Sequence, residues 1–256
     1  MKKKKIALIT GATSGFGLAT AHLLGKNNYD LILTGRRNDR LINLKNEIES
    51  LGKPEVLILC FDIRRRKQVR EAIAGLPTEW RNIDVLINNA GLASGLDNIQ
   101  NGDIEDWEKM IDTNIKGLLY ISREVLPLMV SRNRGHIINI SSIAGREVYE
   151  KGNVYCASKH AVEALTKGMR IDLVKHNIKV TSIAPGMAET EFSIVRFHGD
   201  IQSAKKVYEG FIPLSAKDIA ETILFVVTRP PHVCIDEILI MPTAQASATI
   251  VNRLQN

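Results

Sequence analysis

Tyr155 and Lys159 are four residues apart in the stretch Tyr155-Cys-Ala-Ser-Lys159. On a helix, side chains at this spacing share one face, with Cβ atoms about 6 Å apart. A phenol has a pKa of about 10 and keeps its proton at neutral pH, but a nearby cation lowers that pKa by about 1–3 units. The pair therefore favours a tyrosine that exchanges a proton with an alcohol or a carbonyl group, assisted by the lysine.

Ser142 follows the apolar run that begins at His136, and its hydroxyl could hold a substrate oxygen while Tyr155 exchanges the proton. Two hydroxyl groups can polarise that oxygen, so we expect no metal in the site. The cysteines also lack the spacing of metal ligands, and they fit a reducing cytoplasm: Cys60, Cys156 and Cys234. Tyrosine and lysine are common on helix surfaces, so the surrounding elements must support this interpretation.

Apolar runs rich in β-branched residues alternate with amphipathic stretches from one end of the chain to the other. The expected strands are 6–10, 31–34, 56–61, 85–88, 136–141, 179–183 and 237–241. The expected helices between and after them are 19–27, 40–51, 67–76, 107–131, 155–175 and 216–228. This alternation predicts an α/β fold with a doubly wound, seven-stranded parallel sheet, in one domain that spans residues 1–256.

A glycine-rich turn joins the first expected strand to the first expected helix. Its glycines, Gly11, Gly15 and Gly17, allow a tight turn and a close approach of the backbone to a pyrophosphate. The residues between them are expected to contact the same dinucleotide: Thr13, Ser14 and Phe16. Glycines placed between a strand and a helix in this way are typical of a dinucleotide-binding fold.

Arg36 and Arg37 follow the second expected strand, where an NAD enzyme usually carries an acidic residue for the ribose 2′-hydroxyl. Guanidinium groups bind a 2′-phosphate through charge-assisted hydrogen bonds, whereas a carboxylate would repel it. We therefore expect NADP(H) rather than NAD. The alternative is that both arginines are ordinary surface residues.

Small or polar residues follow the other strands, at the edge where a doubly wound sheet collects ligands. Asp62 and Ile63 are expected near the adenine, and residues after two further strands are expected to approach the cofactor. Those residues are Asn89, Ala90, Gly91, Pro185 and Gly186. Asn114 interrupts an amphipathic pattern, and its amide could orient a water near Lys159, although a structural asparagine fits equally well.

Composition limits the classes of partner. The net charge of +6 is mild, and the basic clusters are not interleaved with aromatic residues, so we expect no nucleic-acid partner. No stretch approaches the roughly 18 apolar residues of a membrane span, so no membrane partner is expected either. The lysine-rich start resembles a signal peptide, but the glycine-rich turn interrupts its apolar run too early.

These motifs, taken in order, resemble the short-chain dehydrogenase/reductase family over essentially the whole chain. The resemblance implies a sheet of order 3-2-1-4-5-6-7, hydride transfer at a nicotinamide and a homotetramer. It also implies that Tyr155 is the acid/base, Ser142 orients the substrate and Asn114 holds a relay water. Lys159 would bind the nicotinamide ribose and lower the pKa of the tyrosine.

Within the family, the chain is most similar to bacterial NADP-dependent 3-hydroxy acid dehydrogenases, which act on L-allo-threonine, serine and 3-hydroxypropionate and reduce malonic semialdehyde. The residues that carry this resemblance include 34–37, 76–84, 110–114, 152–155 and, above all, 190–200. Glu189 departs from the pattern of this subgroup, and it could alter a loop near the substrate.

Residues 186–212 form a long connection that we expect to act as a lid over the substrate. Arg196 in this segment could bind the carboxylate of a hydroxy acid, and Arg146 is a second candidate. The small and apolar residues 243–251 could either contact another subunit or fold back on their own.

Three functions remain open. The first is reversible NADP-linked oxidation of a small 3-hydroxy acid or β-hydroxy amino acid. The second keeps this mechanism in a general carbonyl or 3-oxoacyl reductase. The third is an NADP(H)-binding regulator without turnover, although all four expected catalytic residues are present.

Overall fold

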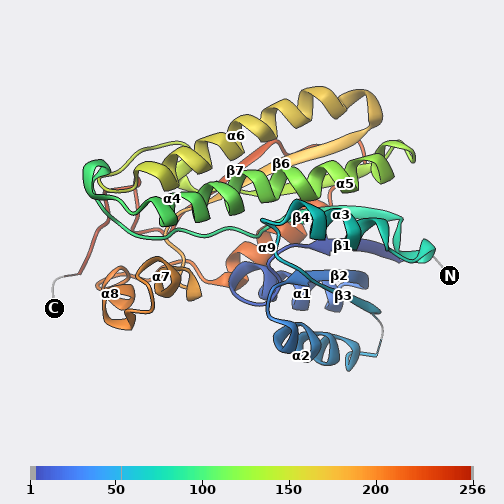
Figure 1. The fold of residues 1–256 in the computed structure, drawn as a ribbon, viewed down its shortest axis with the longest axis horizontal. Coiled ribbons are helices and arrows are strands. Elements are labelled where there is room, and N and C mark those ends of the chain that lie inside the picture. Colours follow the sequence, from blue (N-terminus) through green and yellow to red (C-terminus); the bar gives the residue numbers. More distant parts are fainter. Residues whose placement is uncertain (1–3, 53, 255–256) are drawn as a thin grey trace.

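The computed structural model describes residues 4–52 and 54–254. Within them, seven parallel strands form one sheet in the order β3-β2-β1-β4-β5-β6-β7, which confirms the predicted doubly wound topology (Figure 1). The strands are β1 (Lys5–Ile9), β2 (Tyr29–Gly35), β3 (Val56–Cys60), β4 (Ile83–Asn88), β5 (Gly135–Ile140), β6 (Ile178–Pro185) and β7 (Glu237–Ile240). Within the lysine-rich start of the chain, Lys2 and Lys3 lie outside the described residues.

The central strands are almost continuous apolar runs because both faces of the sheet are covered. In β1, for example, Ala7, Leu8 and Ile9 are fully buried and pair in register with Leu31, Ile32 and Leu33 of β2. Side chains alternate between the two faces, so Ile9 joins one apolar cluster and Leu8 joins the other.

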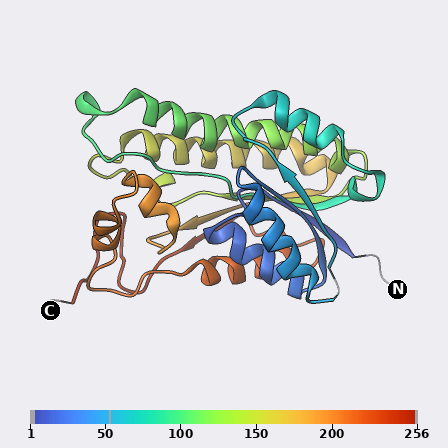
Figure 2. The ribbon, with the colours of Figure 1, turned by 60° about the horizontal axis from the view of Figure 1, so that its bottom comes forward.

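Helices form a layer on each face of the sheet (Figure 2). One layer contains α1 (Gly15–Lys26), α2 (Asn38–Glu49) and α9 (Ala216–Val227). The other contains α3 (Arg66–Ala74), α4 (Ile104–Ile111), α5 (Leu118–Val130) and α6 (Asn153–Leu173). Helix α9 starts at a capping box in which Ser215 and Asp218 satisfy each other's backbone N–H groups.

One expectation needs correction. The segment expected as one helix over 107–131 is interrupted by a π-helical stretch, η3 (Asp112–Gly117), which contains Asn114. The long connection 186–212 contains two short helices, α7 (Glu191–Arg196) and α8 (Ile201–Lys206). The hydroxyl of Thr190 caps α7 and the carboxylate of Asp200 caps α8, each by accepting from backbone N–H groups.

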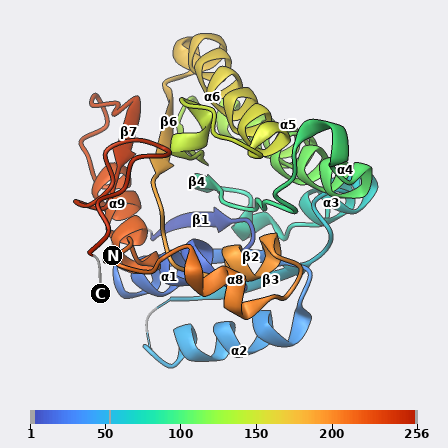
Figure 3. The same ribbon diagram turned by 90° about the vertical axis from the view of Figure 1, so that its left-hand side faces the viewer.

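Helices α7 and α8 lie together at one end of the molecule, beside the carboxyl ends of the strands (Figure 3). The C-terminal tail folds back onto this region of its own chain. The backbone N–H of Leu254 donates to the carbonyl of Gly210, and the N–H of Met187 donates to the side chain of Gln245. The tail therefore supports the connection that carries both helices.

None of the helices in residues 4–52 and 54–254 combines the length and apolar character that a membrane-spanning helix requires.

Candidate active site

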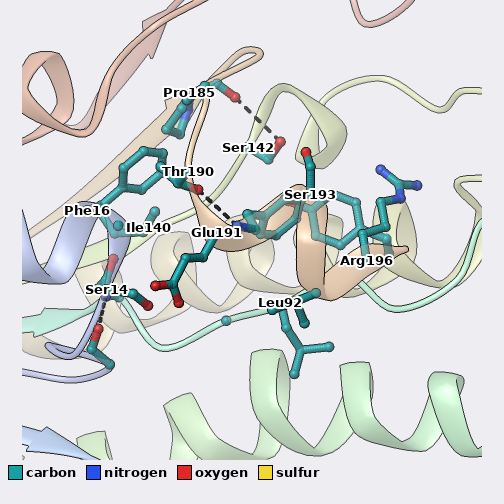
Figure 4. Close-up of a pocket in the computed structure, with 18 of the residues that line it drawn as sticks. Ser14, Phe16, Leu92, Ile140, Ser142, Pro185, Thr190, Glu191, Ser193 and Arg196 are labelled. Carbon is teal, nitrogen blue, oxygen red and sulfur yellow. Dashed lines mark hydrogen bonds between the residues drawn. The ribbon is translucent and has the colours of Figure 1, made fainter. Parts of the chain in front are cut away.

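A cavity of about 610 Å³ opens at the carboxyl ends of the strands, between the glycine-rich turn and α7 (Figure 4). Most of the residues predicted to form the site line it. They are Gly11, Thr13, Ser14, Gly15, Phe16, Arg36, Arg37, Asp62, Ile63, Asn89, Ala90, Gly91, Ser142, Tyr155, Lys159, Pro185, Gly186 and Arg196. Gly17, Asn114 and Arg146 are not among the lining residues. The cavity lies beyond the neighbouring strands β1 and β4, where the strand order reverses, which is the ligand-binding position of this topology.

The glycine-rich turn has the backbone shape that a pyrophosphate site requires. Gly11 and Gly15 have φ angles of +65° and +52°, which side chains other than glycine rarely tolerate. A Cβ atom at Gly17 would lie 2.4 Å from the carbonyl oxygen of Gly11, so only glycine fits behind the turn. Because Gly15 begins α1, the helix presents its N-terminus to the cavity, and the turn fits a dinucleotide.

Asn89 secures this turn from the neighbouring strand. Its side-chain amide donates to the carbonyl of Thr10 at 2.8 Å, and its backbone N–H donates to the Thr10 hydroxyl at 3.0 Å. Asn89 therefore shapes the cavity as well as bordering it, a contribution that the sequence did not predict.

The two arginines after β2 have different surroundings. The guanidinium of Arg37 donates to the hydroxyls of Thr13 and Ser14, each at 2.9 Å, and to the carboxylate of Glu191 at 3.0 Å. Arg36 is exposed beside the same cavity and lines its wall. Together they place two cations where a 2′-phosphate would need them, so the residues present fit NADP(H).

Asp62 and Ile63 border the cavity from the end of β3. Burial alone would raise the pKa of Asp62, but hydrogen bonds from Arg64 and its charge lower that pKa below the ordinary value. Arg64 closes the pair with Nη2 2.6 Å from the carboxylate. Ile63 packs against Gly117, where an added Cβ would lie 3.0 Å from its side chain. The wall at this end is therefore a fixed ion pair beside an apolar surface.

Tyr155 lies on the first turn of α6, only 8% exposed, with its ring packed edge-on against Phe192 at a centroid distance of 5.6 Å. Ser142 caps the short 3-10 helix η4 (Ile143–Gly145), because its hydroxyl accepts from the N–H of Ala144 at 3.1 Å. The same hydroxyl donates to the carbonyl of Pro185 at 3.4 Å. Both side chains therefore face the cavity from fixed elements.

The expected lowering of the Tyr155 pKa by Lys159 is not seen in this structure. Burial raises the pKa of the Tyr155 phenol above its ordinary value, and Tyr149 acts in the same direction. A hydrogen bond with Ser142 and the charge of Arg196 oppose this rise. Burial is the main cause, and the ammonium of Lys159 does not offset it, because its Nζ lies over the Tyr155 ring, 5.9 Å from the ring centre, and donates to the carbonyl of Ile140.

Lys159 is almost completely buried, and its ammonium donates to the carbonyl oxygen of Ile140 at 2.9 Å. Burial lowers the pKa of Lys159 to about 8, while the charge of Glu163 on the next turn opposes that effect. The protonation of Lys159, at the cavity wall, therefore depends on its burial and on the charge of Glu163.

Asn114 is 2% exposed, and its amide is engaged by the protein. The amide donates to the carbonyl of Leu92 at 2.8 Å and to the hydroxyl of Ser158 at 3.0 Å, and it accepts from the N–H of Leu92 at 2.9 Å. Both amide hydrogens that we expected to orient a water are therefore used to join η3 to α6 and to the loop after β4.

Arg196 and Arg146, the two candidates for binding a carboxylate, are clearly separated. Arg196 lies at the end of α7, donates to the hydroxyl of Tyr149 at 2.9 Å and faces the rings of Tyr149 and Tyr155. Arg146 instead forms an ion pair with Glu237 at 3.0 Å, outside the residues that line the cavity. Only Arg196 is therefore placed beside Tyr155.

Sequence reasoning missed several residues of the site, among them Tyr149, Glu191, Phe192 and Gln245. Tyr149 lies in a loop whose sequence has no periodic pattern. In the structure its ring lies against Gly152, where an added Cβ would collide with the ring, so the glycine is the one sequence feature related to its position. Glu191 and Phe192 directly follow Thr190, the cap of α7, so recognising that cap would have placed both on a helix.

The chain is similar in sequence to known dehydrogenases. The family model for short chain dehydrogenase matches residues 5–199. The NADP-dependent 3-hydroxy acid dehydrogenase YdfG of Salmonella typhi is 49% identical over 244 residues, covering 95% of this chain and 97% of that protein. The NADP-dependent 3-hydroxy acid dehydrogenase of Schizosaccharomyces pombe is 44% identical over 252 residues, covering 98% and 97%.

Among solved structures, the closed form of a serine dehydrogenase complexed with NADP+ superposes with a TM-score of 0.90 at 45% identity. The match covers 98% of this chain and all of the other. The likeness therefore extends through α7, α8 and the C-terminal tail as well as the sheet.

Proposed function

The chain belongs to the short-chain dehydrogenase family, and from this premise we propose that it is an NADP-dependent oxidoreductase of small 3-hydroxy acids. The observation that carries the proposal is the joint presence of Tyr155, Ser142 and Arg196 at one end of a cavity whose other end holds Arg36 and Arg37. The first group suits a hydroxy acid, and the second suits a phosphorylated dinucleotide.

In the oxidation direction, Tyr155 takes the hydroxyl proton of the substrate, and Ser142 holds the substrate oxygen by a hydrogen bond. When bound, NADP(H) supplies the nicotinamide that accepts the hydride in oxidation and returns it in reduction. Reduction reverses the proton transfer, so the Tyr155 phenol donates to the developing alkoxide. Burial of the Tyr155 ring keeps bulk water away from the transferring proton.

The cofactor would be held along the carboxyl edge of the sheet. The glycine-rich turn and the N-terminus of α1 would bind the pyrophosphate, and Arg36 and Arg37 would bind the 2′-phosphate. Asp62 and Ile63 would border the adenine. Residues 89–91, Lys159, Pro185 and Gly186 would surround the nicotinamide half, with Lys159 on its ribose.

Arg196 would bind the carboxylate of the hydroxy acid. Its guanidinium uses one donor on Tyr149 and a longer one on the carbonyl of Gly95, at 3.4 Å, which leaves further N–H groups for a ligand. A charge-assisted contact beside Tyr155 fixes a short acid with its hydroxyl at the phenol. L-Serine, L-allo-threonine and 3-hydroxypropionate have this shape, and malonic semialdehyde is the corresponding oxo acid.

Three further properties belong to this proposal. Helices α7 and α8 would act as the lid, since α7 presents Phe192 and Arg196 to Tyr155.

A homotetramer is supported by exposed apolar side chains on α9, β7 and the tail, namely Phe225, Leu239 and Ile250. A cytoplasmic location is supported by the three cysteines, which are free thiols in the described structure.

The direct test is NADPH formation, followed by absorbance, with each of the three hydroxy acids and with simple secondary alcohols. We expect turnover of the hydroxy acids with NADP and little with NAD. Activity confined to neutral alcohols would favour a general carbonyl reductase, and a bulky 3-oxoacyl thioester as best substrate would favour an oxoacyl reductase. Tight NADPH binding without turnover of any carbonyl compound would favour a regulator.

A further inference from the structure

The carboxylate of Glu191 bridges two arginines at the mouth of the cavity. One oxygen lies 3.0 Å from Nη1 of Arg37, and the other lies 2.7 Å from Nη1 of Arg40. Burial alone would raise the pKa of Glu191, but the hydrogen bonds from both arginines lower it below the ordinary value. The carboxylate is therefore ionised at neutral pH and joins the start of α7 to α2.

This bridge lies directly over the glycine-rich turn. Thr190, the residue before Glu191, is in contact range of Gly15, because an added Cβ on the glycine would lie 3.5 Å from the threonine Cβ. Figure 4 shows the side chain of Glu191 directed toward Ser14, whereas Arg196 is at the opposite end of the same helix. The start of α7 is thus held at the cofactor end of the cavity.

Glu191 also determines where Arg37 points. With Nη1 on Glu191, the remaining donors of Arg37 reach the hydroxyls of Thr13 and Ser14 in the turn. A guanidinium held from both sides is preorganised, so less conformational entropy is lost when an anion binds beside it. Glu191 therefore orients a cation that the proposed function assigns to the 2′-phosphate.

Two other residues of α7 contact Tyr155. Phe192, the residue after Glu191, packs on the edge of the Tyr155 ring, and Arg196, about 1.4 turns after Glu191 at the end of the helix, faces that ring. Helix α7 is only six residues long, so a displacement of its first residue also displaces its last residue. The arginine pair and the substrate-facing side chains are therefore parts of one rigid element.

We propose that Glu191 is a positioning residue that couples recognition of the cofactor 2′-phosphate to formation of the substrate site. The bridge to Arg37 and Arg40 aligns Arg37 for the phosphate and, through the same contact, holds Arg196 and Phe192 against Tyr155. This inference rests on the proposed function, because it needs a phosphorylated cofactor and a substrate beside Tyr155.

The opposite role for Glu191 is a competitor that occupies the phosphate site. The geometry favours the positioning role, because Arg36 keeps its guanidinium beside the cavity and Arg37 still has donors directed at the turn. The two roles predict opposite changes in the KM for NADP when the carboxylate is removed.

The test is Glu191→Gln, with Glu189→Gln as the matched control. Glu189 is two residues earlier, exposed and absent from the cavity wall, so its loss removes the same charge without the bridge. The bridging side chains are 42–48% exposed, so we expect a modest effect, about three- to tenfold. The KM values for NADP and for the hydroxy acid should both rise by this factor, while kcat changes by less than about twofold.

Two further measurements sharpen the result. Arg40→Gln should give a smaller rise, because the contact between Arg37 and Glu191 remains. The double variant Glu191→Gln with Arg40→Gln should be no worse than Glu191→Gln alone, since that variant already lacks the contact with Arg40. High salt, at which the Debye length is about 3 Å, should raise the KM values of the wild type and bring them close to those of Glu191→Gln.

The inference is overturned if Glu191→Gln behaves like Glu189→Gln, if it lowers the KM for NADP, or if kcat falls while both KM values stay constant. It is also overturned if the effects of the Glu191 and Arg40 variants add. Failure of the proposed function gives a different result, because the wild type itself would then not turn over hydroxy acids with NADP.

Discussion

The guanidinium of Arg196 lies 5.7 Å from the centre of the Tyr155 ring. It brings a cation from α7 to the phenol that we propose as the acid/base, and its charge acts against the rise in the Tyr155 pKa that burial causes. A substrate carboxylate bound by Arg196 would therefore place the adjacent carbons of a short acid at Tyr155.

Replacing Arg196 by methionine should weaken binding of hydroxy acids selectively. Loss of a hydrogen bond to a charged group costs about 1.5–3 kcal/mol, so the KM for 3-hydroxypropionate should rise about ten- to hundredfold. Neutral secondary alcohols should be affected far less. Arg146→Met is the control, since Arg146 pairs with Glu237 outside the cavity. Equal losses for acids and neutral alcohols would remove Arg196 from the carboxylate site.

Tyr155→Phe should abolish turnover while leaving NADPH binding largely intact. The substitution removes only the hydroxyl that exchanges the proton, and general acid–base catalysis contributes about 10²–10⁴-fold. The ring would still pack against Phe192, so the fold of the site should persist. Steady-state rates and a fluorescence titration with NADPH measure the two properties separately. Retention of more than a few per cent of the activity would contradict the assigned role.

Oxidation should accelerate as the pH rises, and reduction should slow. The base in oxidation is the phenolate of Tyr155, and burial raises the pKa of this group, so the ascending limb should extend into the alkaline range. Profiles of kcat/KM between about pH 6 and 10 test this. Arg196→Met should move the limb to higher pH, because it removes a cation that lowers the Tyr155 pKa. A flat profile across neutrality would count against a tyrosine base.

Cofactor preference should depend on Arg36. Arg36→Asp leaves the Arg37–Glu191 contact in place but puts a carboxylate beside the 2′-phosphate, so the preference for NADP over NAD should fall at least about tenfold. Combining it with Arg37→Ala should abolish the preference. Arg66→Asp makes the same change in charge outside the cavity and serves as the control. An unchanged NADP/NAD ratio of kcat/KM would refute the phosphate assignment.

His136 should make the fold sensitive to acid. Its Nε2 lies 2.9 Å from the Thr181 hydroxyl, which itself donates to the carbonyl of Ile235, so Nε2 must carry the proton. Burial lowers the pKa of His136 from 6.5 to about 3, with Lys179 and Lys5 adding to the effect. A depressed pKa means that the unfolded chain binds the extra proton first, so this stability is present above about pH 6.5 and is lost on acidification.

The free energy of unfolding should therefore fall by about 1.4 kcal/mol for each pH unit below about 6 because of His136. Urea unfolding between about pH 4 and 7 measures this slope. His136→Gln should reduce this slope, because the variant lacks the group that takes up the proton on unfolding. Equal slopes in the wild type and His136→Gln would contradict the prediction.

Much of the architecture could be predicted from the sequence because its signals are local. The apolar runs of strands, the periodicity of helices and the glycine-rich turn depend on neighbouring residues. The structure confirms each expected strand, and the expected ends differ from the observed ends by no more than two residues. The same holds for the gathering of Tyr155, Ser142 and Arg36 around one cavity, since parallel strands bring their carboxyl ends to one edge.

The electrostatics of the site could not be predicted in this way. The spacing of Tyr155 and Lys159 correctly indicated a shared helix face, but burial of both side chains decides the directions of their pKa shifts. Desolvation depends on every element packed around a side chain, so it cannot be obtained from sequence spacing.

The family, the doubly wound sheet and the residue types available for chemistry were predictable from the sequence, because they follow from local patterns and their order along the chain. Which side chain each arginine contacts depends instead on the tertiary structure. Arg146 pairs with Glu237, Arg37 pairs with Glu191, and Arg196 reaches Tyr149. These partners are far apart in sequence, and the packing of α7 and the loop before α6 against the sheet brings them within hydrogen-bond distance.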